Sequence, residues 1–405
     1  MKNLARRLIR LPIKVIRKIL PIFSPTMYGY FEYLIKEVQD LGYTKKEIKS
    51  NFIPSNKKNM LMIAGGLEVG GVASLIHSIC KNNKKYNCIL VVDSKISEEA
   101  ARFYQFDHIY NLGNGIKNSS KIEFVAKLIS HYKIKNIIIN NSLFGYKNLS
   151  TLRSKNVNIF DIIHVVIKNN PFLYFSKKYD NLLCKHIVIS DTVKKNYCNK
   201  LRISPDRVVT INNAVDFEGK FKPKKERQKK YPFSIAFFGR LENDKNPLKF
   251  LDIALSLLEQ EDSIHFFIVG GGSLEYKMRK MIKIEKKSKY FTFCGFDQNP
   301  ERIIETSNMV LITSRHEGLP FAALESISLG IPVISARLGH LDKIIVNGVN
   351  GFIVASSIDS HVNKIREIIS GDLQFERLKV RNSLPSKYRR SFMINEYENL
   401  LDSSP

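Results

Sequence analysis

Cations that directly follow an apolar run are the first residues of this sequence that could do chemistry. Arg240 follows the run FSIAFFG, and Lys245 stands five residues further on, in GRLENDK. At this spacing the two side chains can converge on one diphosphate, whose oxygens accept charge-assisted hydrogen bonds. Two solvated surface charges would have the same spacing, so a diphosphate site needs support from other residues.

Two carboxylates form the second group. Glu317 lies in the loop TSRHEGLPF after the apolar run MVLI, and Glu325 lies eight residues further on. If a helix begins near Pro320 or Phe321, Glu325 lies one to two turns inside it. The backbone before and at the start of that helix would face the same cleft; it belongs to Gly318, Leu319, Pro320 and Phe321. Carboxylates that bind hydroxyls at both ends of a ligand, with cations at its middle, suit a nucleotide sugar.

Glycines and one histidine follow further apolar runs. Gly70 and Gly71 close AGGLEVGG, and Gly271 lies in VGGGSLE. Glycine lets the N–H groups of a helix N-terminus approach an anion closely, although a plain tight turn has the same composition. Neither motif is G-x-G-x-x-G, so a dinucleotide site is not predicted. His164 ends the run FDIIH and could reach a cleft beyond the strand ends, whereas burial in the core is the alternative.

Repeated βα units must position these residues. From Asn59, short runs rich in β-branched residues alternate with amphipathic stretches, which indicates an α/β domain with a buried parallel sheet. The lysine-rich stretch over residues 217–231 predicts an exposed connection, and a second series of βα units begins after it. The sequence therefore predicts two Rossmann-like domains that face a central cleft, with ligands at the carboxyl ends of the strands.

Composition limits the possible partners. The chain has 405 residues, 44% of them hydrophobic, and a formal net charge of +26, which indicates a folded protein that attracts polyanions. It has no zinc-finger spacing, RNA-binding aromatic signature or helix-turn-helix pattern, so no nucleic-acid partner is expected. Five cysteines without a CxxC pair predict free thiols in a reducing cytoplasm. No apolar run reaches the ~18 residues of a membrane-spanning helix.

A basic amphipathic segment opens the sequence. Residues 1–31 carry seven Lys or Arg and no acid, and their apolar residues are spaced for one stripe of a helix. Cations interrupt every candidate apolar core of a signal peptide, so export is not predicted. We expect residues 1–23 to dock on an anionic membrane surface, and packing on the protein's own surface is the alternative.

Together these motifs resemble those of the retaining family-4 glycosyltransferases, which have the GT-B fold. The E-x7-E spacing of Glu317 and Glu325, the GR motif with Lys245, and the run SLGIPVISARLGHLDKIIVNGVNGFIV carry the resemblance, which extends over about residues 59–400. The organisation that it implies is an N-terminal extension over 1–58, an acceptor-side domain over 59–216, a linker over 217–231, a donor-side domain over 232–385, and a C-terminal helix over 386–405 that crosses back to the first domain.

The resemblance implies transfer of a sugar, with retention at the anomeric carbon, from a nucleotide diphosphate sugar to a hydroxyl acceptor. Arg240 and Lys245 match the family's diphosphate-binding pair, which stabilises charge on the leaving group. Glu317 matches the glutamate that holds the donor sugar, and Glu325 matches the one that binds ribose hydroxyls. The donor is expected to be a UDP-sugar.

Three further matches lie in the first half of the chain. Gly70 and Gly71 match a glycine pair beside the donor, and His164 matches a histidine that the family often places near the sugar. The sequence has no D-x-D motif, so neither a metal nor a cofactor besides the co-substrate is expected.

The sequence departs from the family pattern at three places. His340 and Lys343 stand in the GGxxE region, which predicts a changed donor-side loop, and Ala214 replaces the usual glycine after Asn213. The extension before the first strand is also longer than usual for the family. None of these changes removes the diphosphate pair or the E-x7-E carboxylates.

These observations predict synthesis of a bacterial surface polysaccharide at the inner face of the plasma membrane, by a peripheral protein on the cytoplasmic side. The acceptor would be a glycan or a lipid-linked sugar. One alternative is a nucleotide-sugar 2-epimerase of the same fold, which would bind the donor without an acceptor. Another, from a different class, is a basic nucleic-acid-binding protein.

Overall fold

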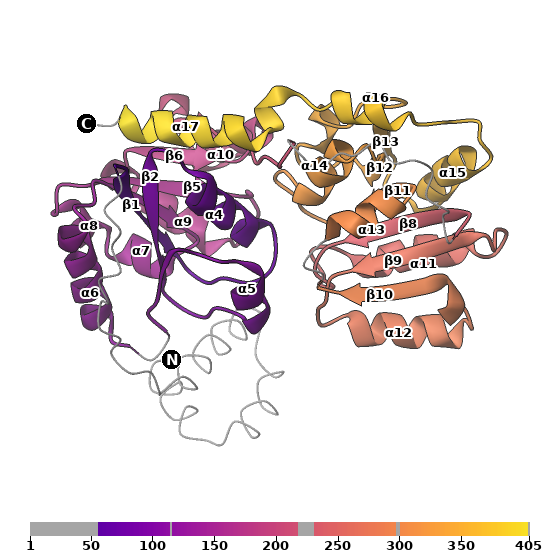
Figure 1. The fold of residues 1–405 in the computed structure, drawn as a ribbon, viewed down its shortest axis with the longest axis horizontal. Coiled ribbons are helices and arrows are strands. Elements are labelled where there is room, and N and C mark those ends of the chain that lie inside the picture. Colours follow the sequence, from indigo (N-terminus) through magenta and orange to yellow (C-terminus); the bar gives the residue numbers. More distant parts are fainter. Residues whose placement is uncertain (1–55, 114–115, 218–230, 297–299, 404–405) are drawn as a thin grey trace, which may run out of the picture.

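The structure, a computed structural model, describes residues 56–113, 116–217, 231–296 and 300–403. Residues 1–23, for which we expect membrane docking, lie outside the described residues. Two α/β units lie side by side and are connected along one side of the molecule (Figure 1). Among the described residues no helix is long and apolar enough to cross a bilayer.

The first unit contains a seven-stranded sheet in the order β3-β2-β1-β4-β5-β6-β7, with every pair parallel. Its strands are β1 (Lys58–Ala64), β2 (Tyr86–Val92), β3 (His108–Asn111), β4 (Asn136–Asn140), β5 (Asn158–Ile163), β6 (Lys185–Val188) and β7 (Val208–Thr210). Every residue of β4 and β5 is buried, as expected of central parallel strands that are covered on both faces. The edge strand β3 alternates between half-buried and exposed residues.

Helices cover both faces of this sheet. They are α4 (Gly71–Asn82), α5 (Glu98–Phe103), α6 (Asn118–His131), α7 (Leu143–Lys147), α8 (Leu149–Arg153), α9 (Pro171–Lys178) and α10 (Asp191–Leu201). Buried apolar residues of α4 and α10 pack on one face, and those of α6, α7 and α8 pack on the other. This arrangement buries both faces of the sheet, which explains its nearly continuous apolar strands.

The second unit repeats the plan with a six-stranded parallel sheet in the order β10-β9-β8-β11-β12-β13. Its strands are β8 (Phe233–Phe238), β9 (Ile264–Val269), β10 (Phe291–Gly295), β11 (Met309–Ile312), β12 (Val333–Ala336) and β13 (Gly351–Val354). Its helices are α11 (Pro247–Leu257), α12 (Glu275–Ile284), α13 (Pro300–Thr306), α14 (Phe321–Ser328), α15 (Ile358–Ile369) and α16 (Arg377–Asn382). The strand order reverses between β8 and β11, as it does between β1 and β4 in the first unit. These two Rossmann-like sheets confirm the predicted α/β fold class.

The last helix, α17 (Arg390–Asp402), lies along the first unit after the chain has left α16 (Figure 1). Its Asp402 carboxylate accepts hydrogen bonds from Lys58 Nζ, Lys85 Nζ and Tyr86 OH at 2.7–2.8 Å. The side chain of Glu398 accepts from the backbone N–H of Lys85 at 3.0 Å. The C-terminal helix is thereby fixed to the first unit by charge-assisted hydrogen bonds as well as by its apolar face.

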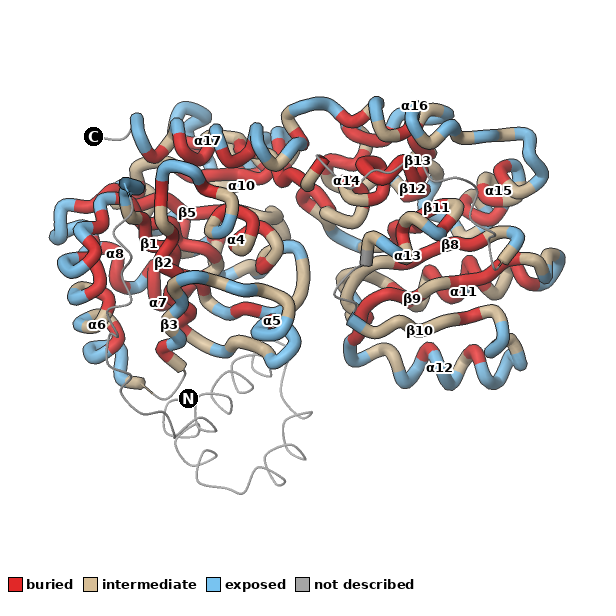
Figure 2. Tube along the Cα trace, in the orientation of Figure 1, coloured by how far each residue is buried: buried red, intermediate tan, exposed pale blue. Residues whose placement is uncertain are grey.

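The chain passes between the units twice, and the two passages are hydrogen-bonded to each other. Val215 N donates to Tyr388 O at 3.0 Å, and Arg390 N donates to Val215 O at 2.9 Å. One apolar cluster extends from β1 through α14 to α17, so the two units share a buried core on this side. Figure 2 shows the buried residues concentrated in the strands, with exposed residues along the outer helices.

The cysteines differ from the expectation of free thiols. Cys80 at the end of α4 and Cys88 in β2 form a disulfide, with their Cα atoms 4.9 Å apart. Cys184 and Cys198 are free thiols. The cysteine count and spacing do not predict this pair. It forms because a short connection between α4 and β2 brings together two residues that are eight positions apart.

Candidate functional site

A cleft of about 1800 Å³ lies between the two units. Its walls come from the loops after β1, β2, β4 and β5 in the first unit and after β8 and β11 in the second. Both points at which the strand order reverses open into it. Ligands of open parallel sheets bind at these positions.

Most of the sequence-predicted site residues line this cleft. The structure brings together Gly70, Gly71, His164, Arg240, Lys245, Glu317, Gly318, Leu319, Pro320, Phe321 and Glu325. Gly271 does not line it. Except for Gly271, the structure therefore places the predicted site residues where one extended ligand could contact them.

Gly271 belongs to a turn that supports the site from behind. Its carbonyl accepts a hydrogen bond from Leu241 N at 2.9 Å, and a Cβ at this position would lie 2.9 Å from the ring of Phe296. A Cβ at Gly270 would lie 2.0 Å from the carbonyl oxygen of Gly239. The glycines of VGGGSLE thus allow the turn that carries Arg240 to pack closely against them, and the prediction that Gly271 contacts the donor is not supported by its position.

Lys245 and Glu317 form an ion pair at the wall of the second unit. Lys245 Nζ lies 2.6 Å from Glu317 Oε1, and the side chains are 24% and 10% exposed. The hydroxyl of Ser314 donates to the same oxygen at 2.7 Å. One edge of the carboxylate is therefore fixed by two donors within the molecule, which orients the group at the cleft.

Arg240 has a different partner. Its Nη2 lies 2.9 Å from Asp244 Oδ2, and both side chains are 41% exposed. Asp244 is one helical turn along the chain and also lines the cleft. This solvated ion pair holds the guanidinium loosely, so a phosphate could replace or share the carboxylate with little loss of free energy.

Two helix N-termini meet at the cleft. α14 begins at Phe321, α4 begins at Gly71, and neither has a side-chain cap. A Cβ at Gly71 would lie 3.1 Å from the Phe321 ring, so only a small residue lets the two helix ends come this close. The unpaired N–H groups and helix dipoles make this region favourable for negative charge.

Glu325 lies inside α14 and also lines the cleft. The negative charge of Glu325 acts on Tyr104 of the first unit. Burial is the main cause of the raised pKa of this tyrosine, and the charge of Glu325 raises that pKa further. The Tyr104 hydroxyl lies 3.0 Å from Ser74 Oγ. Glu325 is therefore at a position between the two units.

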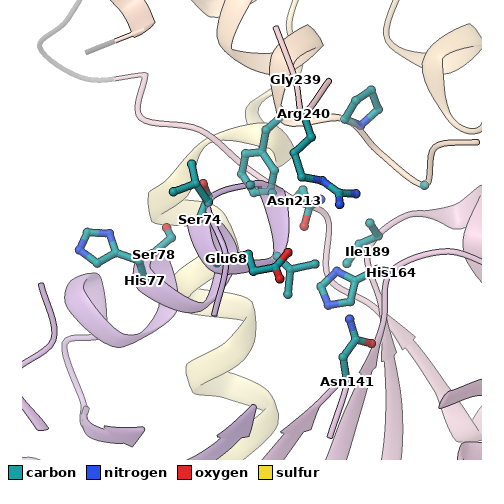
Figure 3. A pocket seen from close by; sticks show the side chains of 18 of the residues that line it. Glu68, Ser74, His77, Ser78, Asn141, His164, Ile189, Asn213, Gly239 and Arg240 are labelled. Carbon is teal, nitrogen blue, oxygen red and sulfur yellow. The ribbon is translucent and has the colours of Figure 1, made fainter. Parts of the chain in front are cut away.

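His164 follows β5 on the wall of the first unit. Its Nε2 lies 3.0 Å from Asn140 Oδ1, and burial lowers its pKa to about 4. The imidazole is consequently neutral at pH 7 and acts as a hydrogen-bonding group. Figure 3 shows His164, Asn213 and Arg240 gathered in one part of the pocket, while His77 lies at another end of it.

The loop after Glu317 is in direct contact with the first unit. A Cβ at Gly318 would lie 2.0 Å from the carbonyl oxygen of His164. Asn213 Nδ2 donates to Leu319 O at 3.0 Å, and Ser190 Oγ donates to Gly318 O at 3.4 Å. The position of the predicted donor loop thus depends on residues of both units.

His340 has a structural position rather than one in the cleft. It is buried, with its ring nitrogens 2.8 Å from Thr192 Oγ1 and 3.0 Å from the Tyr388 hydroxyl. It links α10 of the first unit to the segment that crosses back. His340 therefore forms part of the contact between the units and does not line the cleft.

Several residues of the cleft were not found from the sequence. Asp244 and Ser314 line the cleft and contact Arg240 and Glu317. Asn140, which contacts His164, is buried and does not itself line the cleft. Asp93 lines the wall of the first unit, where burial raises its pKa to about 6 against the hydrogen bond from Ser142. The sequence gives only weak signals for these residues. Asn140 and Asp93 are polar residues at or just after the end of a strand, and Asp244 and Ser314 lie four and three positions from the predicted site residues Arg240 and Glu317.

No group of three or more His, Cys, Asp or Glu side chains that could hold a metal ion occurs among the described residues. On the wall of the second unit, Arg240, Lys245 and the N-terminus of α14 can bind negative charge. Five further cations line the cleft: Lys81, Lys95, Lys121, Lys147 and Arg390.

Two Rossmann-like units that face a shared cleft define the GT-B class of glycosyltransferase folds. The Anabaena protein HepE in complex with UDP has a TM-score of 0.72 at 13% identity, over 85% of this chain and 100% of that chain. The lipopolysaccharide outer core galactosyltransferase WaaB has a TM-score of 0.63 at 18% identity, over 85% of this chain and 99% of that chain. At these identities the likeness shows the fold.

One family model matches the sequence of the second unit. Residues 218–384 match the model of the family "Glycosyl transferases group 1". This match confirms the resemblance to the family that the motifs of the second unit indicate.

Two curated relatives are distant in sequence. The chain is 29% identical over 210 residues to an Escherichia coli UDP-Gal:alpha-D-GlcNAc-diphosphoundecaprenol alpha-1,3-galactosyltransferase, covering 48% of this chain and 52% of that protein. It is 22% identical over 295 residues to a Staphylococcus aureus poly(ribitol-phosphate) alpha-N-acetylglucosaminyltransferase, covering 70% and 58%. The match thus spans little more than half the length of either relative.

Proposed function

We propose that the protein transfers a sugar from a UDP-sugar to a hydroxyl of a glycan or lipid-linked acceptor, with retention at the anomeric carbon. The observation that carries the proposal is the grouping of Arg240, Lys245, Glu317 and Glu325 on one wall of the cleft, beside the N-terminus of α14. Two cations and two carboxylates match the charge pattern of an activated sugar, which has a diphosphate between two hydroxyl-rich ends.

The proposed chemistry uses the cations at the leaving group. When the bond from the anomeric carbon to the diphosphate breaks, negative charge grows on the diphosphate oxygens. Lys245 and Arg240 stabilise that charge, and the N–H groups at the start of α14 add to the effect. We propose that no metal is needed, because these groups supply the positive charge that a bridging ion would supply.

The carboxylates bind the two ends of the donor. Glu317 has one oxygen held by Lys245 and Ser314, so its other oxygen can accept hydrogen bonds from the sugar hydroxyls. Glu325 lies further along the wall and would bind ribose hydroxyls. Gly70 and Gly71 would lie beside the donor, and neutral His164 would form a hydrogen bond to the sugar.

The relatives support the acceptor class. The names of both curated relatives specify a phosphate-containing acceptor, one a diphosphate-linked sugar and the other a poly(ribitol-phosphate). We propose a related role here, in surface polysaccharide synthesis at the cytoplasmic face of the plasma membrane. The first unit would hold the acceptor and the second unit the donor.

The test is a panel of UDP- and GDP-sugars. Thermal shift first identifies the nucleotide sugar that binds, because a ligand of the folded state raises its melting temperature. Turnover with that donor is then compared for the wild type, Glu317→Ala and Arg240→Ala. Arg315→Ala is the control, since this exposed cation lies on the same loop but does not line the cleft.

We expect Glu317→Ala and Arg240→Ala to lose about two orders of magnitude or more in turnover, with Arg315→Ala close to the wild type. Full activity in either site variant would refute the role proposed for that residue. Isomerised sugar produced from the donor without an acceptor would favour the 2-epimerase alternative.

A further inference from the structure

Helix α12 borders the outer edge of the second unit, on the side of the edge strand β10 (Figure 1). Its Met278 and Ile282 are buried in the core of this unit. Arg279 turns back onto the protein, with its guanidinium 3.9 Å above the ring of Phe293 and bonded to Glu275. Met281 is half-buried against the same core, and the exposed side chains of the helix form its outer surface.

That outer surface combines apolar side chains with cations. At 100° per residue, positions 276, 277, 280, 283 and 284 fall within an arc of roughly 120°, which we call the α12 face: Tyr276, Lys277, Lys280, Lys283 and Ile284. Each is exposed, and none is acidic. Figure 2 shows exposed residues along the outer side of this helix.

The apolar members are unusually exposed. Tyr276 is 79% and Ile284 is 65% accessible, and they rank with Tyr174 as the three most exposed large hydrophobic residues of the described part of the chain. Singly exposed apolar residues are common on protein surfaces. Two of the most exposed apolar side chains lie on this one ten-residue helix, and the exposed residues between them in the sequence are all Lys or Arg. This combination needs an explanation.

Positive charge continues beyond the helix. After the exposed Glu285, Lys286, Lys287 and Lys289 follow within five residues of Ile284, and Lys287 Nζ also donates to Leu258 O at 3.0 Å. The ammonium groups of Lys287 and Lys289 lie 5.5 Å and 4.8 Å from the centre of the Tyr290 ring. Next to the α12 face there is therefore a second aromatic residue, Tyr290, with lysines beside it.

We propose that the α12 face docks on an anionic lipid bilayer. Lysines at a bilayer surface bind anionic headgroups, while tyrosine lies well at the level of the headgroups and isoleucine enters the edge of the hydrocarbon. A nucleic acid would be bound by the lysines alone, and it offers no apolar phase for Ile284. The combination of cations with exposed apolar side chains thus favours a lipid surface over other polyanions.

This proposal does not depend on sugar transfer, and it differs from the docking expected of residues 1–23. The α12 face belongs to the second unit. Binding here would hold that unit, with its predicted donor site, at the membrane. If two separate surfaces of one protein bind the membrane, their contributions to its membrane–water partition coefficient multiply. Loss of the α12 face would therefore weaken vesicle binding measurably even in the full chain.

The sharpest test uses the absence of tryptophan from the sequence. In the full chain, Tyr276→Trp introduces a single indole into the α12 face, and Leu378→Trp places a matched one on α16, at the opposite side of the second unit (Figure 1). Each is mixed with vesicles of equal parts phosphatidylcholine and phosphatidylglycerol, and with vesicles of phosphatidylcholine alone. We expect a blue shift of the emission, and quenching by brominated lipid, for Tyr276→Trp on the anionic vesicles only.

A second pair of variants measures affinity. Lys283→Gln/Ile284→Ser removes one cation and one apolar side chain from the α12 face, and Leu378→Ser/Lys379→Gln makes the same change on α16. We expect the first variant to bind anionic vesicles at least about fivefold more weakly, the effect of one lysine near the surface, and the control to bind like the wild type. Thermal unfolding checks that both remain folded.

An unshifted Tyr276→Trp spectrum on the anionic vesicles would overturn the proposal. So would wild-type affinity of Lys283→Gln/Ile284→Ser for those vesicles, or an equal loss in the α16 control. If the α12 variant kept vesicle binding but lost binding to duplex DNA, the face would be a nucleic-acid surface instead. None of these results depends on finding the donor or acceptor.

Discussion

Lys245 combines two roles that substitution can separate. Its ammonium group forms an ion pair with Glu317 at 2.6 Å, and it also faces the cleft in which we propose that a diphosphate binds. Lys245→Met keeps most of the length and the apolar part of the side chain while it removes the charge. The variant therefore tests the ion pair and the proposed stabilisation of the leaving group together.

The expected loss of stability follows from the burial of the pair. Glu317 is 10% and Lys245 is 24% exposed, so Lys245→Met leaves a mostly buried carboxylate with Ser314 as its remaining described donor. Losing one charged partner at such a site costs about 1–3 kcal/mol. This corresponds to a fall of roughly 2–12 °C in melting temperature for a domain of this size. The double variant Lys245→Met/Glu317→Gln removes both charges, so it should recover most of that stability.

The expected loss of activity is larger and is not recovered. One group that stabilises developing charge contributes about 10²–10³ in kcat. We expect this loss in Lys245→Met and at least as large a loss in the double variant. The assays are differential scanning fluorimetry and release of UDP from the donor found in the panel. Wild-type turnover in Lys245→Met would refute the leaving-group role, and a double variant no more stable than Lys245→Met would refute the account of the ion pair.

Three further predictions concern other residues of the cleft. Glu325→Ala should weaken donor binding about tenfold, the equivalent of one charge-assisted hydrogen bond, with a smaller effect on kcat; calorimetric titration with the donor checks this. His164 should lower the free energy of unfolding as the pH drops from 6.5 towards 4, because burial gives it a folded-state pKa of about 4 and the unfolded chain binds more protons in this interval. Buried Asp93, with a pKa of about 6, acts in the opposite direction below that pH. Denaturant titrations should therefore show that His164→Gln loses less stability on acidification than the wild type; the lowered pKa values of His77 and His340, caused mainly by burial, are common to both proteins. Gly318→Ala should lower both the melting temperature and turnover, since its Cβ would lie 2.0 Å from the carbonyl oxygen of His164; an active variant of unchanged melting temperature would contradict the close contact.

The fold was predictable because its signals are local and strong. Runs such as NIIIN and NIFDII are completely buried as β4 and β5, and the alternation of strands with helices leads directly to two parallel sheets. The start of α14 at Phe321 was also readable, since Pro320 can precede a helix but its ring restricts the backbone before it. Such features depend on a few neighbouring residues.

The pairing of side chains was not predictable in the same way. Lys245 and Glu317 are 72 positions apart, and nothing in either segment shows that they form an ion pair. Gly271, predicted to bind the donor, lies outside the cleft lining for a related reason: glycine allows close approach, but composition does not say whether an anion or a protein backbone approaches. His340 was taken as a residue of the donor-side loop, whereas it lies between Thr192 and Tyr388.

The doubled connection between the units limits how they can move. Because the backbone around Val215 is hydrogen-bonded to the returning segment at Tyr388 and Arg390, twisting one unit against the other would break these bonds. A hinge motion in which the two paired segments bend together would keep these hydrogen bonds. The molecule should therefore open and shut about a single axis. It should also stay in one piece after a protease nicks the chain just beyond Phe217, because the second passage and α17 would still tether the halves.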